Sequence, residues 1–384
     1  MAGEACVDLL SVGTGFAAGR LRGEVASLVL LVRSGIKDDP ASKGGLHHLV
    51  EHVLFAGLDK GRHALHEAFV TTMEYTLFQF LFPDRHLEEC LGQIVERLER
   101  RDVDPEAVRR ESRAISREMV ERRANAFDRY VDNLASEYWG AAQPGEISRA
   151  DVAELVEARH RNTSCQALTY VGPRSGDEVS AIVNDVWASS CGAPLERAVP
   201  ASPPELAAPY WHEWEGDVVT VLPTCGYRGI ESYVYRILLV YFLDCLSREL
   251  RQKGGLVYAI HHSVLLYPDR GFIVLLVPNC AGSGEAVVRT IEDTTRRVMA
   301  LGDGDADELR AYCRSELFEC TLRFESTKQL AHAMALSALR DEWRTPEALL
   351  ESLENLQAPQ LTGATSRMFG LFEEAGEAID RLRF

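Results

Sequence analysis

The chain has 384 residues and a formal charge of −17, and 46% of its residues are apolar while 26% are charged. This balance is typical of a folded globular protein and excludes a disordered or fibrous one. The strong acidity argues against a nucleic-acid-binding protein, which normally presents a basic face. No stretch approaches the roughly 20 consecutive apolar residues of a membrane span. The length predicts two domains.

Two features of the sequence predict a cytoplasmic protein. At the N-terminus, Glu4 and Asp8 interrupt the apolar residues and no basic region precedes them, so we expect no secretory signal. The nine cysteines lie scattered from Cys6 to Cys320 without a C-x-x-C pair. This distribution is typical of reduced, mostly buried thiols and argues against a disulfide framework.

The first half of the sequence predicts a mixture of strands and helices. Val25–Val32 is a mostly apolar run suited to a β-strand, and it predicts a buried strand. Asp104 followed by Pro105 predicts a helix start, because the aspartate can cap the first turn and proline fits its first position. The predicted order is a strand at 25–32, a helix at about 41–55, extended chain at 69–82, helices at 85–101 and 105–133, a strand at 164–171 and a helix to about 189.

A proline-rich segment, residues 191–210, lacks apolar periodicity and predicts a linker. It separates an N-terminal domain, residues 1–195, from a C-terminal domain, residues 209–384. The second half predicts strands at 218–222 and 271–277, a long helix at about 230–252, and helices at 285–300, 305–322, 327–338 and 345–356. Strands and helices in two successive sets predict an α+β protein of two tandem, sandwich-like domains, each a mostly antiparallel sheet with helices packed on one face.

The run His48-Leu49-Val50-Glu51-His52 carries the clearest chemical signal. Residues four apart project from the same face of a helix, so His48 and His52 can occupy two corners of a tetrahedral zinc site. Glu51 points towards the same face, where its carboxylate can take a proton from a water activated by the metal. The order H-x-x-E-H is the inverzincin signature. A histidine-rich helix that only covers a core is the structural alternative.

A zinc site needs a third protein ligand, and Glu118 is the candidate that we expect to supply it. Glu111 and Glu118 are seven residues apart and therefore share one face of the second predicted helix. One of the two can bind the metal while the other orients a histidine from behind. Glu121 is a rival ligand, and a solvated run of charges is the alternative interpretation of this helix.

These residues, together with several others, resemble the pitrilysin-type (inverzincin) zinc metallopeptidases. The resemblance runs through Gly45 to Phe55 and the Glu111/Glu118 pair. Residues 25–35, followed by Asp38-Asp39, resemble the family's first strands. The segment Thr72-Met73-Glu74-Tyr75-Thr76 resembles the strand before its second helix. The segment Arg251-Gln-Lys-Gly-Gly-Leu-Val-Tyr258 resembles its arginine-to-tyrosine motif. The chain is similar to one half of a full-length member, as in the mitochondrial processing peptidase subunits and small bacterial relatives.

The resemblance implies a zinc-dependent endopeptidase with one Zn²⁺ per chain, acting on short or unfolded peptides, with leader-peptide or precursor processing among its possible roles. It implies that Arg251 and Tyr258 hold the substrate and stabilise the oxyanion at the zinc site of another chain, in a homodimer or in a heterodimer with a related subunit. The extended segment Phe69, Val70, Thr71 and Thr72 is expected to bind a peptide as an added strand. The alternative is a non-catalytic or partner-dependent subunit of a heterodimeric peptidase-like complex.

The sequence departs from the family's pattern in ways that leave the substrate open. The segment between Gly57 and Glu67 is about ten residues shorter than is usual in the family, and Ala68 stands where relatives often have asparagine. Five other histidines near these motifs are not expected to bind metal. His47 should point about 100° away from His48 on a helix. His63 and His66 lie in a predicted loop, and His261 and His262 lie in a predicted strand.

Overall fold

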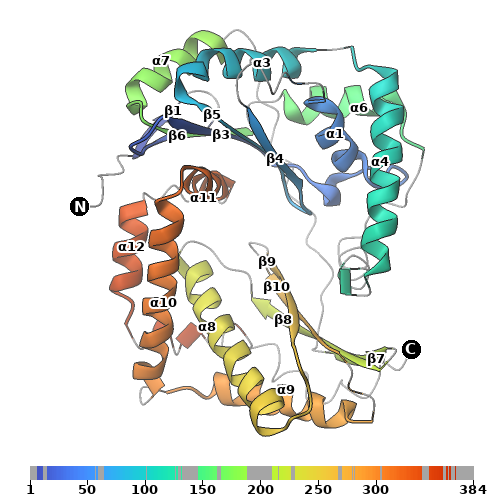
Figure 1. Ribbon diagram of the computed structural model, residues 1–384, viewed down its shortest axis with the longest axis vertical. Coiled ribbons are helices and arrows are strands. Elements are labelled where there is room, and N and C mark those ends of the chain that lie inside the picture. The colour runs from blue at the N-terminus through green and yellow to red at the C-terminus, as the bar shows by residue number, and fades with distance from the viewer. Residues whose placement is uncertain are drawn as a thin grey trace. The chain divides into compact units, whose positions relative to one another are not determined.

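The computed structural model (Figure 1) describes most of the chain. The described residues are 7–11, 15–56, 58, 65–100, 102–125, 127–128, 131, 146–161, 166–187, 210–214, 216–225, 230–266, 270–278, 280, 282–302, 305–339, 346–357, 360–361, 363–364 and 368. Apart from Tyr210, the predicted linker lies outside these residues, as does His63. In the described part, no helix combines the length and apolar character needed to cross a membrane.

The chain divides into two compact units, and the second part of the sequence contributes to both. The first unit comprises residues 1–204 and 322–347, and the second comprises residues 205–321 and 348–384. The predicted C-terminal domain included all residues from 209 onwards. Helix α11 (Thr327–Leu339) instead packs on β2, β3 and β6 of the first unit, where its buried face covers one face of the sheet.

The first unit is built on a six-stranded sheet with the order β1-β2-β6-β3-β5-β4. All neighbours pair antiparallel except β2 and β6, which are parallel. The strands are β1 (Val7–Ser11), β2 (Gly15–Arg20), β3 (Val25–Val32), β4 (His66–Thr71), β5 (Thr76–Pro83) and β6 (Gln166–Gly172). The predicted strand at 25–32 is the buried β3, in which every residue after Val25 is shielded from solvent.

Both faces of this sheet are covered by helices, and alternation of side chains along the strands explains how. Leu28, Leu30 and Phe80 point into a core shared with the helices of one face, whereas Gln79 and Thr169 point to the other face and donate hydrogen bonds to backbone carbonyls of α11. Figure 1 shows α11 on the side of the sheet opposite α3 and α7. The helices of the first face are α1 (Leu46–Leu54), α3 (Leu87–Glu99), α6 (Arg149–Leu155) and α7 (Gly176–Trp187).

An aromatic cluster joins the edge of the sheet to the end of α1. Phe55, just after α1, makes tilted or edge-to-face contacts with Phe69 of β4 and with Phe78 and Phe80 of β5, at centroid separations of 4.8–5.6 Å. Such pairs stabilise beyond the area that they bury. The cluster fixes the position of β4 against α1.

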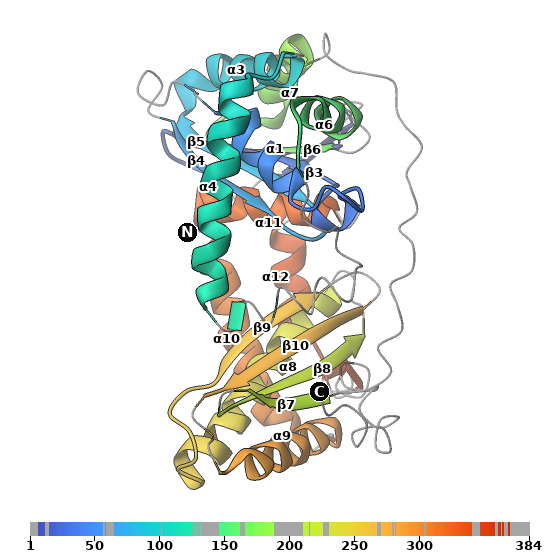
Figure 2. The same ribbon diagram turned by 90° about the vertical axis from the view of Figure 1, so that its right-hand side faces the viewer.

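Local sequence signals determine where the first unit's helices begin and end. Gly45 has φ 92°, a left-handed conformation that ends the helical path, so α1 begins at Leu46 and not near residue 41 as predicted. Helix α4 (Pro105–Ala124) begins as predicted, with the Asp104 side chain accepting from the Glu106 amide. It is interrupted at Asn125, whose backbone is extended, and the described residues 127–128 and 131 are helical again within the range predicted to 133. Figure 2 shows α4 alongside α1, and the two helices pack against each other.

The second unit has a four-stranded antiparallel sheet with the order β7-β8-β10-β9. Its strands are β7 (Tyr210–Trp214), β8 (Asp217–Cys225), β9 (His261–Leu266) and β10 (Arg270–Val277), and they are visible in Figure 2. Its helices are α8 (Ile230–Ser247), α9 (Gly284–Met299), α10 (Ala306–Phe324, in this unit up to Thr321) and most of α12 (Pro346–Glu354). These elements, with those of the first unit, confirm the predicted α+β class with antiparallel-dominated sheets.

Candidate metal centre

Helices α1 and α4 bring two histidines and one glutamate together. The Nε2 atoms of His48 and His52 are 3.3 Å apart, and Glu118 Oε2 lies 3.7 Å from the first and 3.8 Å from the second. One ligand atom from each side chain lies within 4.8 Å of the other two. Four-residue spacing on α1 stacks the imidazoles one turn apart, and the packing of α4 on α1 supplies the carboxylate.

The separations of these atoms fit a zinc ion. Zinc binds imidazole nitrogen and carboxylate oxygen at about 2.0–2.2 Å, so ligand atoms at two tetrahedral corners lie roughly 3.3–3.5 Å apart. The observed 3.3–3.8 Å differs from this spacing by only a few tenths of an ångström. Glu118 is 51% exposed, so the group opens towards solvent, and three protein ligands leave a fourth corner free.

Glu111 lies behind His52. Its Oε2 atom is 3.4 Å from Nδ1 of His52, and its Oε1 atom accepts a hydrogen bond of 2.8 Å from Nε of Arg110. A carboxylate at Nδ1 favours the tautomer that leaves Nε2 free as a metal ligand. Glu118 thus faces Nε2 of both histidines, whereas Glu111 faces Nδ1 of His52.

The electrostatics around His48 favour a neutral imidazole, which is the form that binds metal. Burial lowers the pKa of His48, while the nearby carboxylates of Glu51 and Glu118 act in the opposite direction. Glu51 is 8% exposed and close enough to His48 to influence its charge. Its carboxylate is therefore near the candidate metal ligands without being one of the three clustered side chains.

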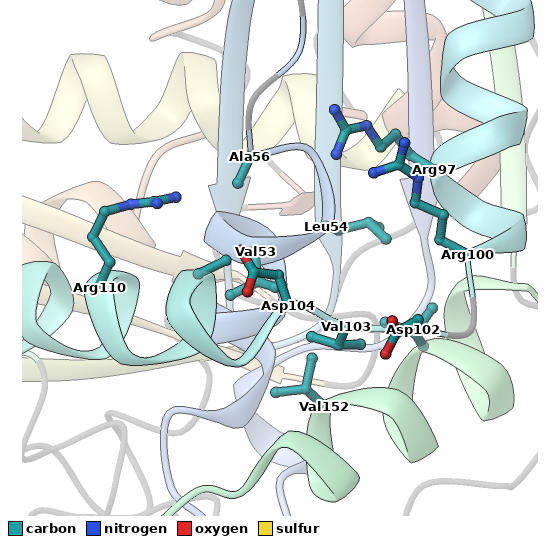
Figure 3. A pocket seen from close by; sticks show the side chains of 12 residues that line it. Val53, Leu54, Ala56, Arg97, Arg100, Asp102, Val103, Asp104, Arg110 and Val152 are labelled. Atoms are coloured by element: carbon teal, nitrogen blue, oxygen red, sulfur yellow. The ribbon is translucent and has the colours of Figure 1, made fainter.

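A pocket of about 240 Å³ lies between the ends of α1 and α3, the start of α4, and α6 (Figure 3). Its wall includes Val53 and Leu54, which follow His52 in α1, and Arg110, which contacts Glu111. None of His48, Glu51, His52, Glu111 and Glu118 lines it. The pocket is therefore separate from the candidate metal-binding group, although α1 and α4 contribute residues to both.

Arg251 and Tyr258 belong to the second unit and lie side by side there. The Arg251 guanidinium carbon is 5.3 Å from the centre of the Tyr258 ring, a cation–π contact, and Tyr258 is 83% exposed. The helix predicted at about 230–252 is α8 followed by a π-helical turn, Arg248–Lys253, that carries Arg251. Such turns are rare and often occur at functional sites. The pair presents a guanidinium and a phenol to solvent.

Strand β4 is an edge strand of the first sheet, and it contains most of the predicted peptide-binding segment. The Thr72 amide donates to the Tyr75 carbonyl, so the backbone groups of Thr72 point towards the chain that leads into β5. In an antiparallel ladder, successive residues of an edge strand point their backbone groups alternately towards the neighbouring strand and away from it. The backbone groups of Thr71 and Phe69 therefore point away from β5. The Phe69 side chain packs into the aromatic cluster, whereas Val70 is 38% exposed. Any peptide contact made by Phe69 would therefore involve its backbone.

Thr72 lies in a turn that divides the extended segment predicted at 69–82 into β4 and β5. Its hydroxyl donates to the Tyr75 carbonyl and accepts from the Glu74 and Tyr75 amides. Such a threonine-centred turn reverses the chain after β4.

The structure also identifies residues that the sequence did not single out for a role near this group. His47 is fully buried, and it contacts Asp39 and Ser34. His160 is buried nearby, and burial with the neighbouring His47 lowers its pKa to about 3. Asp39 was visible only as part of the resemblance, because nothing in its local sequence indicates a contact eight residues away.

Comparisons with solved structures identify the fold. The chain is similar to a candidate M16-like peptidase from Alicyclobacillus acidocaldarius, with a TM-score of 0.77, 14% identity and 96% coverage of both chains. A protease from Helicobacter pylori also gives a TM-score of 0.77, with 13% identity and coverage of 95% of this chain and 97% of that one. The inactive domain of an M16 peptidase from Pseudomonas fluorescens gives 0.77, with 15% identity and 96% coverage of both.

The likeness is one of structure and not of sequence. No family model matches the chain, and a search of curated proteins gives no match either. Identities of 13–15% over nearly the whole length establish a shared architecture but no shared activity. The chain therefore has the M16-like peptidase fold, the pitrilysin-like architecture predicted from its motifs.

Proposed function

We propose that the protein is a zinc-dependent endopeptidase that hydrolyses short or unfolded peptides. One observation carries the proposal: ligand atoms of His48, His52 and Glu118 lie within 4.8 Å of one another, beside the carboxylate of Glu51. The geometry fits zinc, and the M16-like fold supports the assignment to peptide hydrolysis.

In this proposal each residue of the group has one task. His48 and His52 would hold a zinc ion through Nε2, and Glu118 would hold it through a carboxylate oxygen. The ion would supply a Lewis acid for the peptide carbonyl and would lower the pKa of water towards about 7. Glu51 accepts the proton of the attacking water on its carboxylate and delivers it to the departing amine. Glu111 keeps His52 in the correct orientation through Nδ1.

The edge strand β4 would bind the peptide substrate. A peptide added as a further antiparallel strand would bond to the outward backbone groups of Phe69 and Thr71, independent of its side chains. A folded protein rarely offers a free extended segment of this kind. Backbone recognition at β4 therefore favours short or unfolded substrates.

Arg251 and Tyr258 complete the proposed site from a second chain. Their exposed guanidinium and phenol are suited to hold a substrate backbone and to stabilise the negative charge that develops on the scissile carbonyl oxygen. Because this chain carries both the metal group and this pair, a homodimer would contain two complete sites. A heterodimer with a related subunit is the second arrangement that we propose to test.

A non-catalytic subunit is the competing function, and one comparison favours it: the Pseudomonas fluorescens structure is described as an inactive domain. Two histidines, Glu51 and Glu118 stand together in the present chain, which supports activity over a purely structural role. The two functions differ in whether peptide cleavage depends on Glu51.

The experiment compares the purified wild-type chain with Glu51→Gln, a variant of matched size that keeps the metal ligands. Zinc content is measured by atomic emission, and cleavage by a panel of quenched fluorescent peptides without stable structure. The proposal predicts about one zinc per chain in both proteins and a loss of at least 10²-fold in cleavage by Glu51→Gln. A zinc-loaded wild type that cleaves no peptide would favour the non-catalytic or partner-dependent subunit. Equal cleavage by both proteins would overturn the mechanism.

A further inference from the structure

A buried polar network lies at the start of the helix that carries the metal ligands. Asp39 Oδ1 is 2.6 Å from Nδ1 of His47, and Nε2 of His47 is 2.7 Å from the Ser34 hydroxyl. The side chains of Asp39 and His47 have no solvent exposure, and Ser34 is also fully buried. Buried polar groups with this many short contacts hold one conformation, because leaving any of them unpaired would be costly.

The succession Asp39–His47–Ser34 is that of a hydrolase triad, but these three residues are not placed to act as one. A nucleophilic serine must meet its substrate, and Ser34 is 0% exposed. Ser34 also lies within 3.1 Å of Asp38 Oδ2, so its hydroxyl is engaged within the protein. The network therefore has a structural task and not a nucleophilic one.

That task begins at the first turn of α1. Gly45 precedes the helix and has no side chain with which to cap it. Asp39 does this from six residues away: its Oδ2 accepts from the Gly45 amide at 2.7 Å, and its Oδ1 accepts from the His47 amide at 3.0 Å. A carboxylate also complements the positive end of the helix dipole. One side chain thus fixes the start of α1 and the His47 ring immediately before His48.

The same loop also holds the end of the edge strand. The amides of Ile36 and Lys37 donate to the carbonyls of Thr72 and Met73, and the Thr76 hydroxyl donates to the Ser34 carbonyl. Residues 34–39 therefore contact α1 through Asp39 and the β4–β5 hairpin through their backbone. The two elements that the proposed function assigns to metal binding and peptide binding meet at this loop.

We propose that Asp39 and His47 are positioning residues that set α1, and with it His48 and His52, relative to the edge strand β4. This inference rests on the proposed function for its consequence at the metal, but not for the structural coupling itself. Removing the Asp39 carboxylate frees the first turn of α1 and leaves His47 without its Nδ1 partner. Both the spacing of the two metal ligands and the hairpin contacts of residues 34–37 should then loosen.

The test uses Asp39→Ala, Asp39→Asn and a matched control, Val50→Ala. Val50 is a fully buried apolar residue of α1 and lies between the two metal-binding histidines, so its truncation destabilises the same helix without touching the network. Zinc affinity is measured by competition with a chromophoric chelator, and ligand geometry by the visible spectrum of the Co²⁺-substituted protein. We expect Asp39→Ala to weaken zinc binding 10–100-fold and to shift the Co²⁺ bands. Asp39→Asn, which keeps one acceptor oxygen, should lie between it and wild type.

We expect Val50→Ala to lower the denaturation midpoint about as much as Asp39→Ala does. Its zinc affinity should nevertheless change less than threefold. If Val50→Ala and Asp39→Ala lose affinity equally, the network only contributes stability and the positioning role is overturned.

A second readout does not depend on metal: amide hydrogen exchange of the metal-free protein. Asp39→Ala should speed exchange at His47 and at Thr72 at least tenfold, and Val50→Ala should leave Thr72 unchanged. Unchanged exchange at both amides in Asp39→Ala would overturn the coupling, whereas absence of zinc binding in wild type would overturn only the proposed function.

Discussion

His52 and Glu111 lie on different helices, and Nδ1 of the histidine is 3.4 Å from Oε2 of the glutamate. This contact leaves Nε2 of His52 directed at His48 and Glu118. The two glutamates of α4 therefore differ in placement although they are alike in type: Glu118 faces Nε2 of both histidines, and Glu111 faces Nδ1 of His52. In zinc sites, partners of this second kind orient the ligand and affect metal affinity.

We expect Glu111→Gln to weaken zinc binding by about 10–100-fold without removing a metal ligand. The neutral amide can still accept from His52 but loses the charge that makes the histidine a better ligand. Chelator competition measures the affinity. Glu121→Gln, which changes the rival carboxylate on the same helix, should retain wild-type affinity. Loss of binding in Glu121→Gln with normal binding in Glu111→Gln would reverse the assignment.

Phe69 should matter for stability more than its edge position indicates. Its ring packs against Phe55, Phe78 and Phe80 at centroid separations of 5.3–5.6 Å. We expect Phe69→Ala to lower the free energy of unfolding by about 3 kcal/mol, measured by urea denaturation. Val70→Ala, at a partly exposed neighbour, should cost less than about 1 kcal/mol. Equal losses would argue against the aromatic cluster as the anchor of β4.

The Asp151 carboxylate should contribute stability that depends on pH. Hydrogen bonds from Ser148 and Lys43 lower the pKa of Asp151 from 3.8 to about 2. Because the folded pKa lies below the unfolded one, the stabilisation is fully present above pH 4 and is lost as the pH falls towards 2. Lys43 precedes α1, so this contact joins the start of the zinc-motif helix to α6.

Urea denaturation of wild type and Asp151→Asn from pH 7 down to pH 2.5 checks this. The variant should be less stable at pH 7, and the difference should shrink as the pH falls below 4. Glu154→Gln, which neutralises an exposed carboxylate of the same helix, should show no such change of its stability difference with pH. A difference that stays constant or grows towards acid would contradict the assignment.

Mixing two inactive variants tests whether sites are shared between chains. Glu51→Gln lacks the base but keeps Arg251. Arg251→Ala keeps the base but lacks the arginine. If the arginine and tyrosine act on another chain's metal group, a mixture of the two variants should regain up to about a quarter of wild-type activity, because one site in a mixed dimer is intact. Peptide cleavage after co-refolding or subunit exchange provides the measurement. Mixtures that remain as inactive as either parent would indicate that each chain forms its own site or needs a different partner.

The metal group was predictable because its signals are local. His48, Glu51 and His52 lie within two helical turns, and the seven-residue spacing of Glu111 and Glu118 needs only a helix to place both on one face. The strand β3 was equally clear, since its short, mostly apolar run of valines and leucines is typical of a buried strand. In these cases short-range geometry decides the outcome.

The features that could not be predicted depend on contacts between distant segments. The return of α11 to the first sheet is set by Gln79 and Thr169, which contact backbone carbonyls more than 150 residues away. Asp39 caps the first turn of α1 by accepting from the Gly45 amide, although a capping side chain usually belongs to the residue adjacent to the helix. Neither relationship leaves a periodic trace in the sequence, so only the folded chain reveals it.

The central claim is that His48, His52 and Glu118 bind one zinc ion, and X-ray absorption at the zinc edge of the loaded protein tests it most directly. The account predicts a first shell of nitrogen and oxygen at about 2.0–2.1 Å, with the multiple scattering of two imidazoles and no sulfur. In His48→Ala the bound zinc should fall to background after dialysis. A sulfur shell near 2.3 Å, or an unchanged spectrum in His48→Ala, would contradict the claim.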